Sequence, residues 1–316
     1  MKFLVTGGTG FIGWRVVQNL LQRRISVVVG ELNVDAGVAA RLPGAEFAAL
    51  DVSDANSVKA VFQKHPDITH AIHLAYLMSA EVEANPHLGA SVNILGMINL
   101  FEAAVRQKLA RLVFASSETY YGASQKPYGD RDVTEDDFAS PAEHFFTYGM
   151  MKVLNEFTAQ KYVKKHGISL ACARPPVVFG YGRKRGSALW AEDFATLPAL
   201  GKPVALPFPA RTRDCWIYVD DCAEQFVQLA LKPQLAHFAY NNGGESVTAK
   251  ELAEVVRHWL PNAEISFDES KPTTPLIDRM DGRRLENEIG FKPRPLLEGV
   301  RAHINEARLA AGLKPV

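Results

Sequence analysis

The chain has 316 residues, enough for one large domain or two interleaved ones. Its 35 lysines and arginines balance 35 aspartates and glutamates, so no overall field favours binding to nucleic acid or to an acidic membrane. The three cysteines form no Cys-x-x-Cys pair, which indicates free thiols in a reducing compartment rather than a disulfide framework or a zinc site. The sequence shows no signal peptide and no run of about 18 apolar residues. We therefore expect a cytoplasmic protein without a metal, a nucleic-acid partner or a membrane span.

Apolar runs alternate with amphipathic helical patterns through the first half of the chain. This alternation predicts an α/β fold with a doubly wound parallel sheet that is buried on both faces. The predicted strands are 2–6, 26–30, 46–50, 69–74, 110–116 and 168–174. The predicted helices of this half are 11–23, 54–64, 88–108 and 147–166.

A glycine-rich turn joins the first predicted strand to the first predicted helix. Its spacing satisfies G-x-G-x-x-G at Gly8, Gly10 and Gly13, and G-x-x-G-x-x-G if Gly7 is counted first. The glycines allow a sharp turn and let a phosphate approach the backbone, while the amides at the helix start attract its charge. The segment predicts a binding site for the pyrophosphate of a dinucleotide.

The ends of the next strands indicate which dinucleotide binds. Glu31 ends the second strand, where a carboxylate can accept hydrogen bonds from the adenosine ribose and would repel a 2′-phosphate. This favours NAD over NADP. Asp51 closes the third strand within reach of the adenine amino group. The small segment Leu74-Ala75 suits backbone lying against the cofactor, whereas we interpret His73 as a packed core histidine.

A candidate proton-transfer group comes from two later segments. Tyr148 and Lys152 are four residues apart in a predicted helix and so share one face. A nearby ammonium stabilises a phenolate and lowers the phenol pKa toward the range of a general base. Ser116 and Ser117 follow the fifth strand, and Ser117 could hydrogen-bond the reacting oxygen. We predict that Ser117, Tyr148 and Lys152 are catalytic.

Prolines punctuate the chain after Arg174, and the strand–helix alternation stops there. We predict an NAD-binding Rossmann domain over 1–174, with parts of 211–235 returning to it, and a mainly substrate-binding, loop-rich lobe over 175–316. Helical patterns in this second half are predicted at 220–231, 248–259 and 296–311.

The chain resembles the extended short-chain dehydrogenases/reductases of the NAD-dependent epimerase/dehydratase family. By this resemblance Tyr148 is the catalytic acid or base, Lys152 holds the nicotinamide ribose, and Ser117 orients the substrate. Asn93 would steady the active-site helix, and Arg213 stands where many relatives contact a substrate phosphate. The motifs that carry the likeness are T-G-G-T-G-F-I-G, Glu31, Asp51-Val52, N-I-L-G, S-S-E-T-Y-Y-G, Y-G-M-M-K, Arg174-Pro175, R-D-x-x-I-Y-V-D-D and N-N-G-G-E-S.

The resemblance also implies a homodimer formed through the long helices 88–108 and 147–166. We interpret the basic run Arg183-Lys184-Arg185 as local anion contacts or solvated loop. Substrate contacts are expected from Ser117, Glu118, Thr119, Val177, Arg183 and Arg213. Cofactor contacts are expected from Gly7, Gly10, Phe11, Ile12, Gly13, Glu31, Asp51, Val52, Leu74, Ala75, Asn93, Ser116, Tyr148, Lys152, Pro175 and Val178.

Two departures from the family pattern bear on the reaction. Dehydratases of the family typically carry an Asp-Glu pair after the active-site hydroxyl, but here Glu118-Thr119 lacks one carboxylate. Thr119 suits sugar epimerases, whereas Glu118 is atypical of them. Relatives that bind nucleotide sugars often have an amide where this chain has Val177, so a hydrogen-bonding group for a sugar diphosphate is lost.

Three functions remain open at this point. The leading hypothesis is an NAD-dependent epimerase acting on a sugar or nucleotide sugar. The alternative is a simple NAD-dependent dehydrogenase or reductase of a smaller or less polar alcohol or ketone, which Val177 favours, as do the nearby aromatics Phe145, Phe146, Trp190 and Trp216. The third hypothesis is a non-enzymatic NAD-sensing protein. Such relatives usually lose the Tyr–Lys pair, which this chain keeps as Tyr148 and Lys152.

Overall fold

A computed structural model describes residues 1–34, 36–184 and 188–316 of the chain. Its central sheet has seven strands: β1 (Lys2–Thr6), β2 (Ser26–Glu31), β3 (Glu46–Ala49), β4 (His70–His73), β5 (Arg111–Ala115), β6 (Leu170–Arg174) and β10 (Ala239–Asn241). All pair in parallel, in the order β10-β6-β5-β4-β1-β2-β3. This is the doubly wound Rossmann order, and it reverses between β1 and β4, where such sheets bind ligands.

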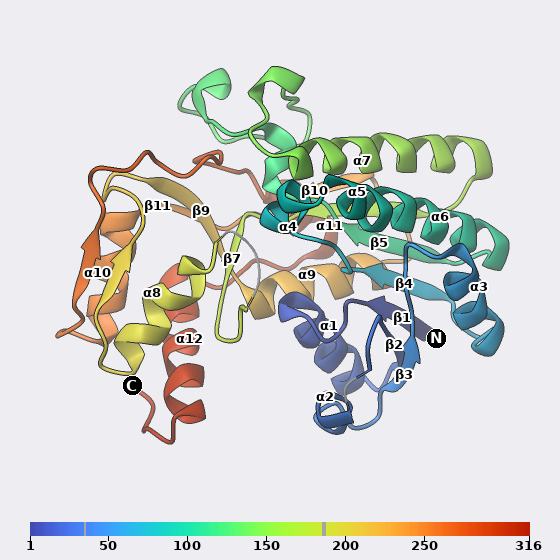
Figure 1. Cartoon of the computed structure of the whole chain (residues 1–316), viewed down its shortest axis with the longest axis horizontal. Helices are drawn as coiled ribbons and strands as arrows, with labels where there is room; N and C mark the ends of the chain where they lie inside the picture. The colour runs from blue at the N-terminus through green and yellow to red at the C-terminus, as the bar shows by residue number, and fades with distance from the viewer. Residues whose placement is uncertain (35, 185–187) are drawn as a thin grey trace.

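Helices cover both faces of this sheet, as the near-continuous apolar strands require. Along β1, Phe3 and Val5 face one core while Leu4 faces the other. Figure 1 shows helices both below and above the sheet. The lower pair, which pack against each other, are α1 (Phe11–Gln22) and α9 (Val219–Leu231). The upper set comprises α3 (Ala55–Lys64), α6 (Gly96–Gln107) and α7 (Thr147–His166).

The six predicted strands and the helices 11–23, 54–64 and 147–166 are confirmed to within two residues. The predicted helix 88–108 is instead three consecutive segments: α5 (Pro86–Ala90), the π-helical turn η1 (Ser91–Leu95) and α6. Short elements that the sequence patterns did not predict are α2 (Ala36–Ala40), α4 (Ser79–Ala84) and the 3₁₀ turns η2 (Glu118–Tyr121), η3 (Lys126–Tyr128) and η4 (Pro141–Glu143).

The C-terminal half builds a lobe at one end of the main sheet (Figure 1). Its two small sheets contain β7 (Val177–Phe179), β9 (Arg213–Tyr218) and β11 (Glu245–Thr248), and β8 (Val204–Leu206) with β12 (Ile265–Phe267). Its helices are α8 (Trp190–Ala199), α10 (Ala249–Trp259) and α12 (Leu296–Ala310), whereas α11 (Arg283–Ile289) packs on α9 and β10. Trp216 is buried among Phe179, Phe194 and Trp190, so it is a core residue of the lobe.

Two elements of this half join the first sheet rather than the lobe. Helix α9 packs against α1, and β10 pairs with β6 as the seventh strand. The domain division at residue 174 stays a prediction.

One helical stretch among the described residues, Pro86–Gln107, is long and apolar enough to cross a membrane by length and composition. Its mean hydropathy is 1.5, and 44% of it is buried. Core helices pass the same test, and here Met97, Leu100 and Phe101 are buried in the core between α6 and the sheet. The stretch therefore carries no argument for a membrane span.

Candidate active site

The glycine turn forms a tight cradle between β1 and α1. Gly7 has φ +70°, and a Cβ on it would lie 2.8 Å from the backbone of Leu74 and Ala75. A Cβ on Gly13 would lie 2.0 Å from the carbonyl oxygen of Gly7. Gly10 caps α1 without a side-chain hydrogen bond, so the first amides of the helix are available to an anion. The turn therefore has the close backbone approach that a pyrophosphate needs.

Carboxylates stand at the ends of the next two strands. The Oε1 atom of Glu31 accepts hydrogen bonds from the Thr9 amide at 2.7 Å and the Thr9 hydroxyl at 2.8 Å. This fixes the carboxylate beside the glycine turn and leaves Oε2 for a ribose hydroxyl. Asp51 accepts from the amide and hydroxyl of Ser53 at 2.9 and 2.7 Å, and Val52 is buried next to it. These residues fit the adenosine half of NAD.

Tyr148 and Lys152 lie in the first turns of α7 and are both buried. The Lys152 Nζ donates a hydrogen bond of 2.7 Å to the carbonyl oxygen of Ala115, at the end of β5, and lies 5.0 Å from the centre of the Tyr148 ring. Ser117 follows β5, and its Oγ accepts from the Thr119 amide at 3.1 Å, so its proton remains free to donate to a substrate oxygen. The three predicted catalytic residues thus gather at the carboxyl edge of the sheet.

The close packing of η2 on α7 explains this placement. A Cβ on Gly149 would lie 2.8 Å from the carbonyl oxygen of Thr119. Only glycine lets the segment after β5 come this close to the residue that follows Tyr148. The Pro175 carbonyl accepts the Glu118 amide at 3.0 Å and joins this segment to the chain after β6.

Burial opposes charge on both members of the Tyr–Lys pair. It raises the pKa of Tyr148 above its usual value, an effect that Arg183 opposes and Glu118 reinforces. Burial lowers the pKa of Lys152 well below its usual value, while Glu156 acts in the opposite direction. Keeping Lys152 charged is therefore the condition for using Tyr148 as a base near neutral pH.

A buried ion pair anchors α7 to β6, and the sequence patterns did not predict it. Arg174 donates from Nε and Nη2 to the two carboxylate oxygens of Glu156 at 2.8 and 2.6 Å, and both side chains are almost fully buried. The Ser116 hydroxyl donates to the same carboxylate. Arg174 also lies 3.6 Å from the centre of the Tyr120 ring. Since Glu156 is one helical turn beyond Lys152, this pair holds the catalytic helix in register.

Glu118 and Arg183 lie near enough to Tyr148 to shift the pKa of its phenol. Glu118 is buried and, among the described residues, its Oε2 has no hydrogen-bond partner. Burial raises the pKa of this carboxyl well above its usual value, Asp214 adds to the rise, and Arg183 opposes it. Arg183 donates to the Val178 carbonyl at 2.7 Å. Lys184 is exposed beside it, whereas Arg185 of the same basic run lies outside the described residues.

Arg213, the expected phosphate contact, is engaged within the lobe. At the start of β9 its Nη1 donates to the Ser246 carbonyl at 2.8 Å, and its Nη2 lies 3.4 Å from a Glu251 oxygen. Val177 is buried in β7, opposite Trp216 of β9. Arg213 is partly exposed and keeps N–H donors beyond these two contacts, whereas Val177 offers no polar group to a sugar diphosphate.

Asn93 links the chain after β4 to the catalytic helix. Its side chain accepts from the Leu77 amide and donates to the Leu77 carbonyl, both at 2.9 Å. The side chain of Asn155, on α7, donates to the Asn93 carbonyl at 2.8 Å. The π-helical turn η1 leaves this carbonyl free for a contact outside its own helix. The position supports the steadying role that the resemblance implies.

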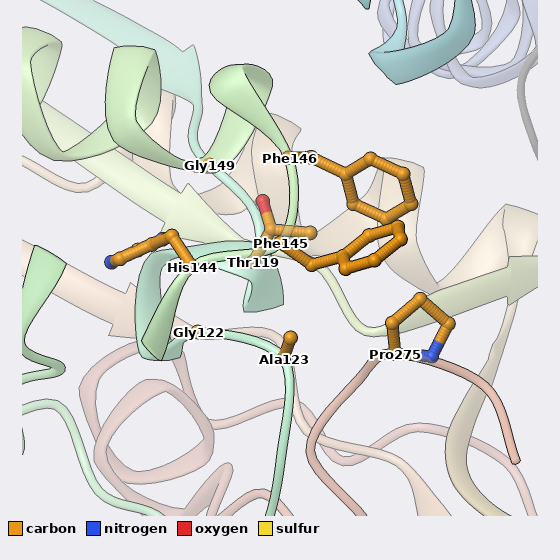
Figure 2. Close-up of a pocket in the computed structure, with 8 residues that line it drawn as sticks. All are labelled: Thr119, Gly122, Ala123, His144, Phe145, Phe146, Gly149 and Pro275. Carbon is orange, nitrogen blue, oxygen red and sulfur yellow. The ribbon is translucent and has the colours of Figure 1, made fainter. Parts of the chain in front are cut away.

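Figure 2 shows a small pocket beside η2, with the rings of Phe145 and Phe146 on one side and His144 on the other. It lies next to Thr119, whose hydroxyl is buried without a partner among the described residues. The pocket is lined by Thr119, Gly122, Ala123, His144, Phe145, Phe146, Gly149 and Pro275. Within the described ranges, no cluster of His, Cys, Asp or Glu residues could hold a metal ion.

A model of the NAD-dependent epimerase/dehydratase family matches residues 3–243. The chain belongs to this family. It is thus an NAD-dependent enzyme of the extended short-chain dehydrogenase/reductase type, and the predicted fold and cofactor are confirmed. The roles of the individual site residues remain predictions.

Relatives in the epimerase/dehydratase family differ in the reactions their names describe. A putative UDP-glucose 4-epimerase of Methanocaldococcus jannaschii is 27% identical over 96% of this chain and 97% of its own. The NAD complex of Thermus thermophilus UDP-glucose 4-epimerase is 27% identical, with a TM-score of 0.78 over 98% of this chain and 99% of its own. An L-threonine dehydrogenase of Cupriavidus necator has a TM-score of 0.85 at 21% identity over 97% and 99%, which shows the fold alone.

Sequence reasoning missed three residues of this site: the buried Asn155 and Glu156 and the partly buried Tyr76. Glu156 stands one turn after Lys152, a spacing that could have indicated it. Tyr76 follows Leu74-Ala75, and a bulky ring directly after this short segment could have indicated it. Nothing in the local pattern around Asn155 indicated its contact with Asn93.

Proposed function

We propose that this chain is an NAD-dependent dehydrogenase or reductase of a small hydroxy or keto compound that carries no diphosphate. The burial of Val177 opposite Trp216 is the observation that carries the proposal, because this position offers an apolar side chain where relatives that bind nucleotide sugars often have an amide.

The residues at the sheet edge divide the work of such a reaction. Ser117 donates a hydrogen bond to the substrate oxygen and fixes its position. Tyr148 takes the hydroxyl proton during oxidation and returns it during reduction. Lys152 lowers the pKa of the Tyr148 phenol through its positive charge. NAD, when bound, supplies the hydride acceptor for the carbon that bears this oxygen.

An epimerase is the second candidate. It is favoured by the similarity to two UDP-glucose 4-epimerases, each 27% identical to this chain over nearly the full length of both proteins. In that case Tyr148 would take the hydroxyl proton as the substrate is oxidised to a ketone. The hydride would then return to the other face of this ketone, and NAD would be regenerated at the end of each cycle.

Net cofactor reduction separates the two candidates. Purified protein would be incubated with excess NAD and with two substrate sets: small hydroxy acids, amino alcohols and secondary alcohols in one, and free and UDP-linked sugars in the other. A dehydrogenase forms NADH in proportion to the substrate consumed, measured at the NADH absorbance band. An epimerised sugar formed without net NADH, by protein that retains NAD through purification, would reject the dehydrogenase proposal.

A further inference from the structure

We propose that Tyr76 is a positioning residue that holds the Lys152 ammonium in place through the face of its ring. The proposal rests on the proposed function, since it concerns the lysine that activates Tyr148. Tyr76 follows β4 and the Leu74-Ala75 backbone that contacts the glycine turn, and its ring lies against Lys152 of α7. Neither the resemblance nor the spacing of motifs assigned it a role.

The contact between the two side chains is close. The Lys152 Nζ lies 3.1 Å from the centre of the Tyr76 ring, against 5.0 Å for the Tyr148 ring. A desolvated cation gains most from an aromatic face at such short range. Lys152 is 1% exposed, so it has almost no water to replace this contact.

The donors of the ammonium can be accounted for one by one. A lysine ammonium carries three N–H donors. One donates to the Ala115 carbonyl at 2.7 Å, and we assign a second to the face of the Tyr76 ring, whose centre lies 3.1 Å from Nζ. The third remains for the nicotinamide ribose that Lys152 is expected to hold. Without the Tyr76 ring, the ammonium would have one fixed contact and would be free to rotate away from the ribose.

The ring itself is fixed from behind. Tyr76 packs on the His73 ring with the centroids 4.5 Å apart and an interplanar angle of 56°. His73 is held by a hydrogen bond of 2.6 Å between its Nδ1 and the Thr6 hydroxyl in β1. Burial, with Lys152 adding to it, lowers the pKa of His73 to about 3, so the imidazole is neutral and does not repel the ammonium.

The other groups that face Lys152 do not replace this contact. On α7, Tyr148 is neutral at pH 7, and Glu156 is engaged by the guanidinium of Arg174. From β6, burial raises the pKa of the Cys172 thiol well above its usual value, so it carries no charge. Among these side chains, the Tyr76 ring is therefore the one that stabilises the ammonium without being shared with another cation, and it adds to the Ala115 carbonyl.

Two substitutions separate the ring from the hydroxyl, which is buried without a partner among the described residues. Tyr76→Phe keeps the aromatic face, and Tyr76→Leu removes it. Binding of NAD would be measured by isothermal titration. Tyr76→Phe should bind within about twofold of the unaltered protein and Tyr76→Leu about tenfold more weakly, a difference of about 1.4 kcal/mol.

Turnover as a function of pH gives a second readout. In the oxidation direction Tyr148 must lose its proton, so the rate rises with pH. Tyr76→Leu should shift the pH at which the rate rises to a value about one unit higher. A less stable ammonium lowers the pKa of Tyr148 by a smaller amount. Tyr76→Phe should leave the pH of this rise unchanged. Phe138→Leu, an exchange at an exposed ring away from Lys152, serves as the matched control, and thermal unfolding verifies that all variants fold.

A double variant tests whether Tyr76 acts through Lys152. In a Lys152→Met background, Tyr76→Leu should weaken NAD binding no further. Equal losses in Tyr76→Phe and Tyr76→Leu, or an additive loss in the double variant, would overturn the proposal. If none of the tested alcohols is oxidised but NAD binding follows the expected pattern, the proposed function fails and the role of Tyr76 stands.

Discussion

Tyr148 is the residue on which the proposed oxidation or reduction of the substrate depends. Its burial raises the phenol pKa, so the hydroxyl stays protonated until the charge of Lys152 and the bound cofactor favour the phenolate. The aromatic ring also packs with Val82 and Met151. Removing only the oxygen should therefore remove the acid or base and preserve the packing.

Tyr148→Phe should lower kcat by about a thousandfold, within the range that general acid–base catalysis contributes. Binding of NAD should change less than twofold, because Lys152 and the glycine turn are untouched. Steady-state turnover and isothermal titration measure the two effects separately. An unchanged kcat would show that proton transfer at this site uses another group.

Asp214 makes stability depend on pH. Burial raises its pKa from 3.8 to about 7, although the Thr274 hydroxyl, which donates at 2.6 Å, opposes the rise. In the unfolded chain the carboxyl ionises at lower pH, so the unfolded state loses its proton first. Stability is fully present below about pH 4 and is lost as the pH rises to about 7.

Asp214→Asn should remove this dependence. Between pH 5 and pH 8 the unaltered protein should lose roughly 2–4 kcal/mol of unfolding free energy through Asp214, and the variant should not. Urea unfolding at the two pH values measures the difference. The same exchange at the exposed Asp193 of α8 should leave the pH dependence unchanged. If the unfolding free energy of Asp214→Asn changed with pH as much as that of the unaltered protein, the pH dependence could not be assigned to Asp214.

At the scale of elements, the position of α7 decides whether the site forms. Three polar contacts tie this helix to the sheet and to η1: Lys152 to Ala115, Glu156 to Arg174 and Asn155 to Asn93. Asn155 and Glu156 stand three and four residues after Lys152, so the three side chains lie on the same side of the helix. A helix held only by apolar packing could shift along its axis without breaking a directional contact.

Glu156→Gln should destabilise the fold by about 3–5 kcal/mol, because it leaves the buried guanidinium of Arg174 without a countercharge. Urea unfolding would measure the loss. Adding Arg174→Met in the same chain should restore part of it, since the unpaired charge is then removed as well. A loss below about 1 kcal/mol in the single variant would show that the pair is not needed for stability.

Elements with strong periodicity could be predicted from the sequence, and those shaped by distant contacts could not. The strand and helix bounds of the first half follow from apolar runs, the glycine turn and helical spacing. The π-helical turn inside the predicted helix 88–108 was missed, because the Asn93 contacts that accompany it are made with Leu77 and Asn155. No local pattern contains that information.

At the scale of the whole molecule, one apolar surface is left exposed along two neighbouring helical segments. Leu88 and Leu95 on α5 and η1 are 46% and 53% exposed, and Leu154 and Phe157 on α7 are 47% and 57% exposed. Both segments lie on the same side of the sheet (Figure 1). We propose that a second copy of the chain covers this surface, as the resemblance implies.

Leu95→Glu combined with Phe157→Glu should convert a dimer into a monomer, because the charges would be buried without partners. Light scattering coupled to size exclusion measures the mass. Leu309→Glu, at an exposed position of α12, should leave the dimer intact. If the unaltered chain is already a monomer at micromolar concentration, the proposal is wrong.

Two residues of the substrate lobe show what motifs leave undecided, and their substrate roles remain predictions. Arg213 and Val177 were assigned to substrate by their place in motifs. The structure engages Arg213 with Ser246 and Glu251 and places Val177 opposite Trp216 in a small sheet. Whether a matching residue is free to bind depends on neighbours that lie far away in the sequence.

The sequence by itself determined the Rossmann sheet and the NAD cofactor, and it predicted Ser117, Tyr148 and Lys152 as the catalytic residues. These depend on turn chemistry, on periodicity and on spacing within single elements, which are short-range properties of the chain. Only the tertiary structure decided what surrounds the lysine: the Tyr76 ring, the Ala115 carbonyl and the Glu156–Arg174 pair. Those groups come from separate strands and helices, and their distances are set by how the layers pack.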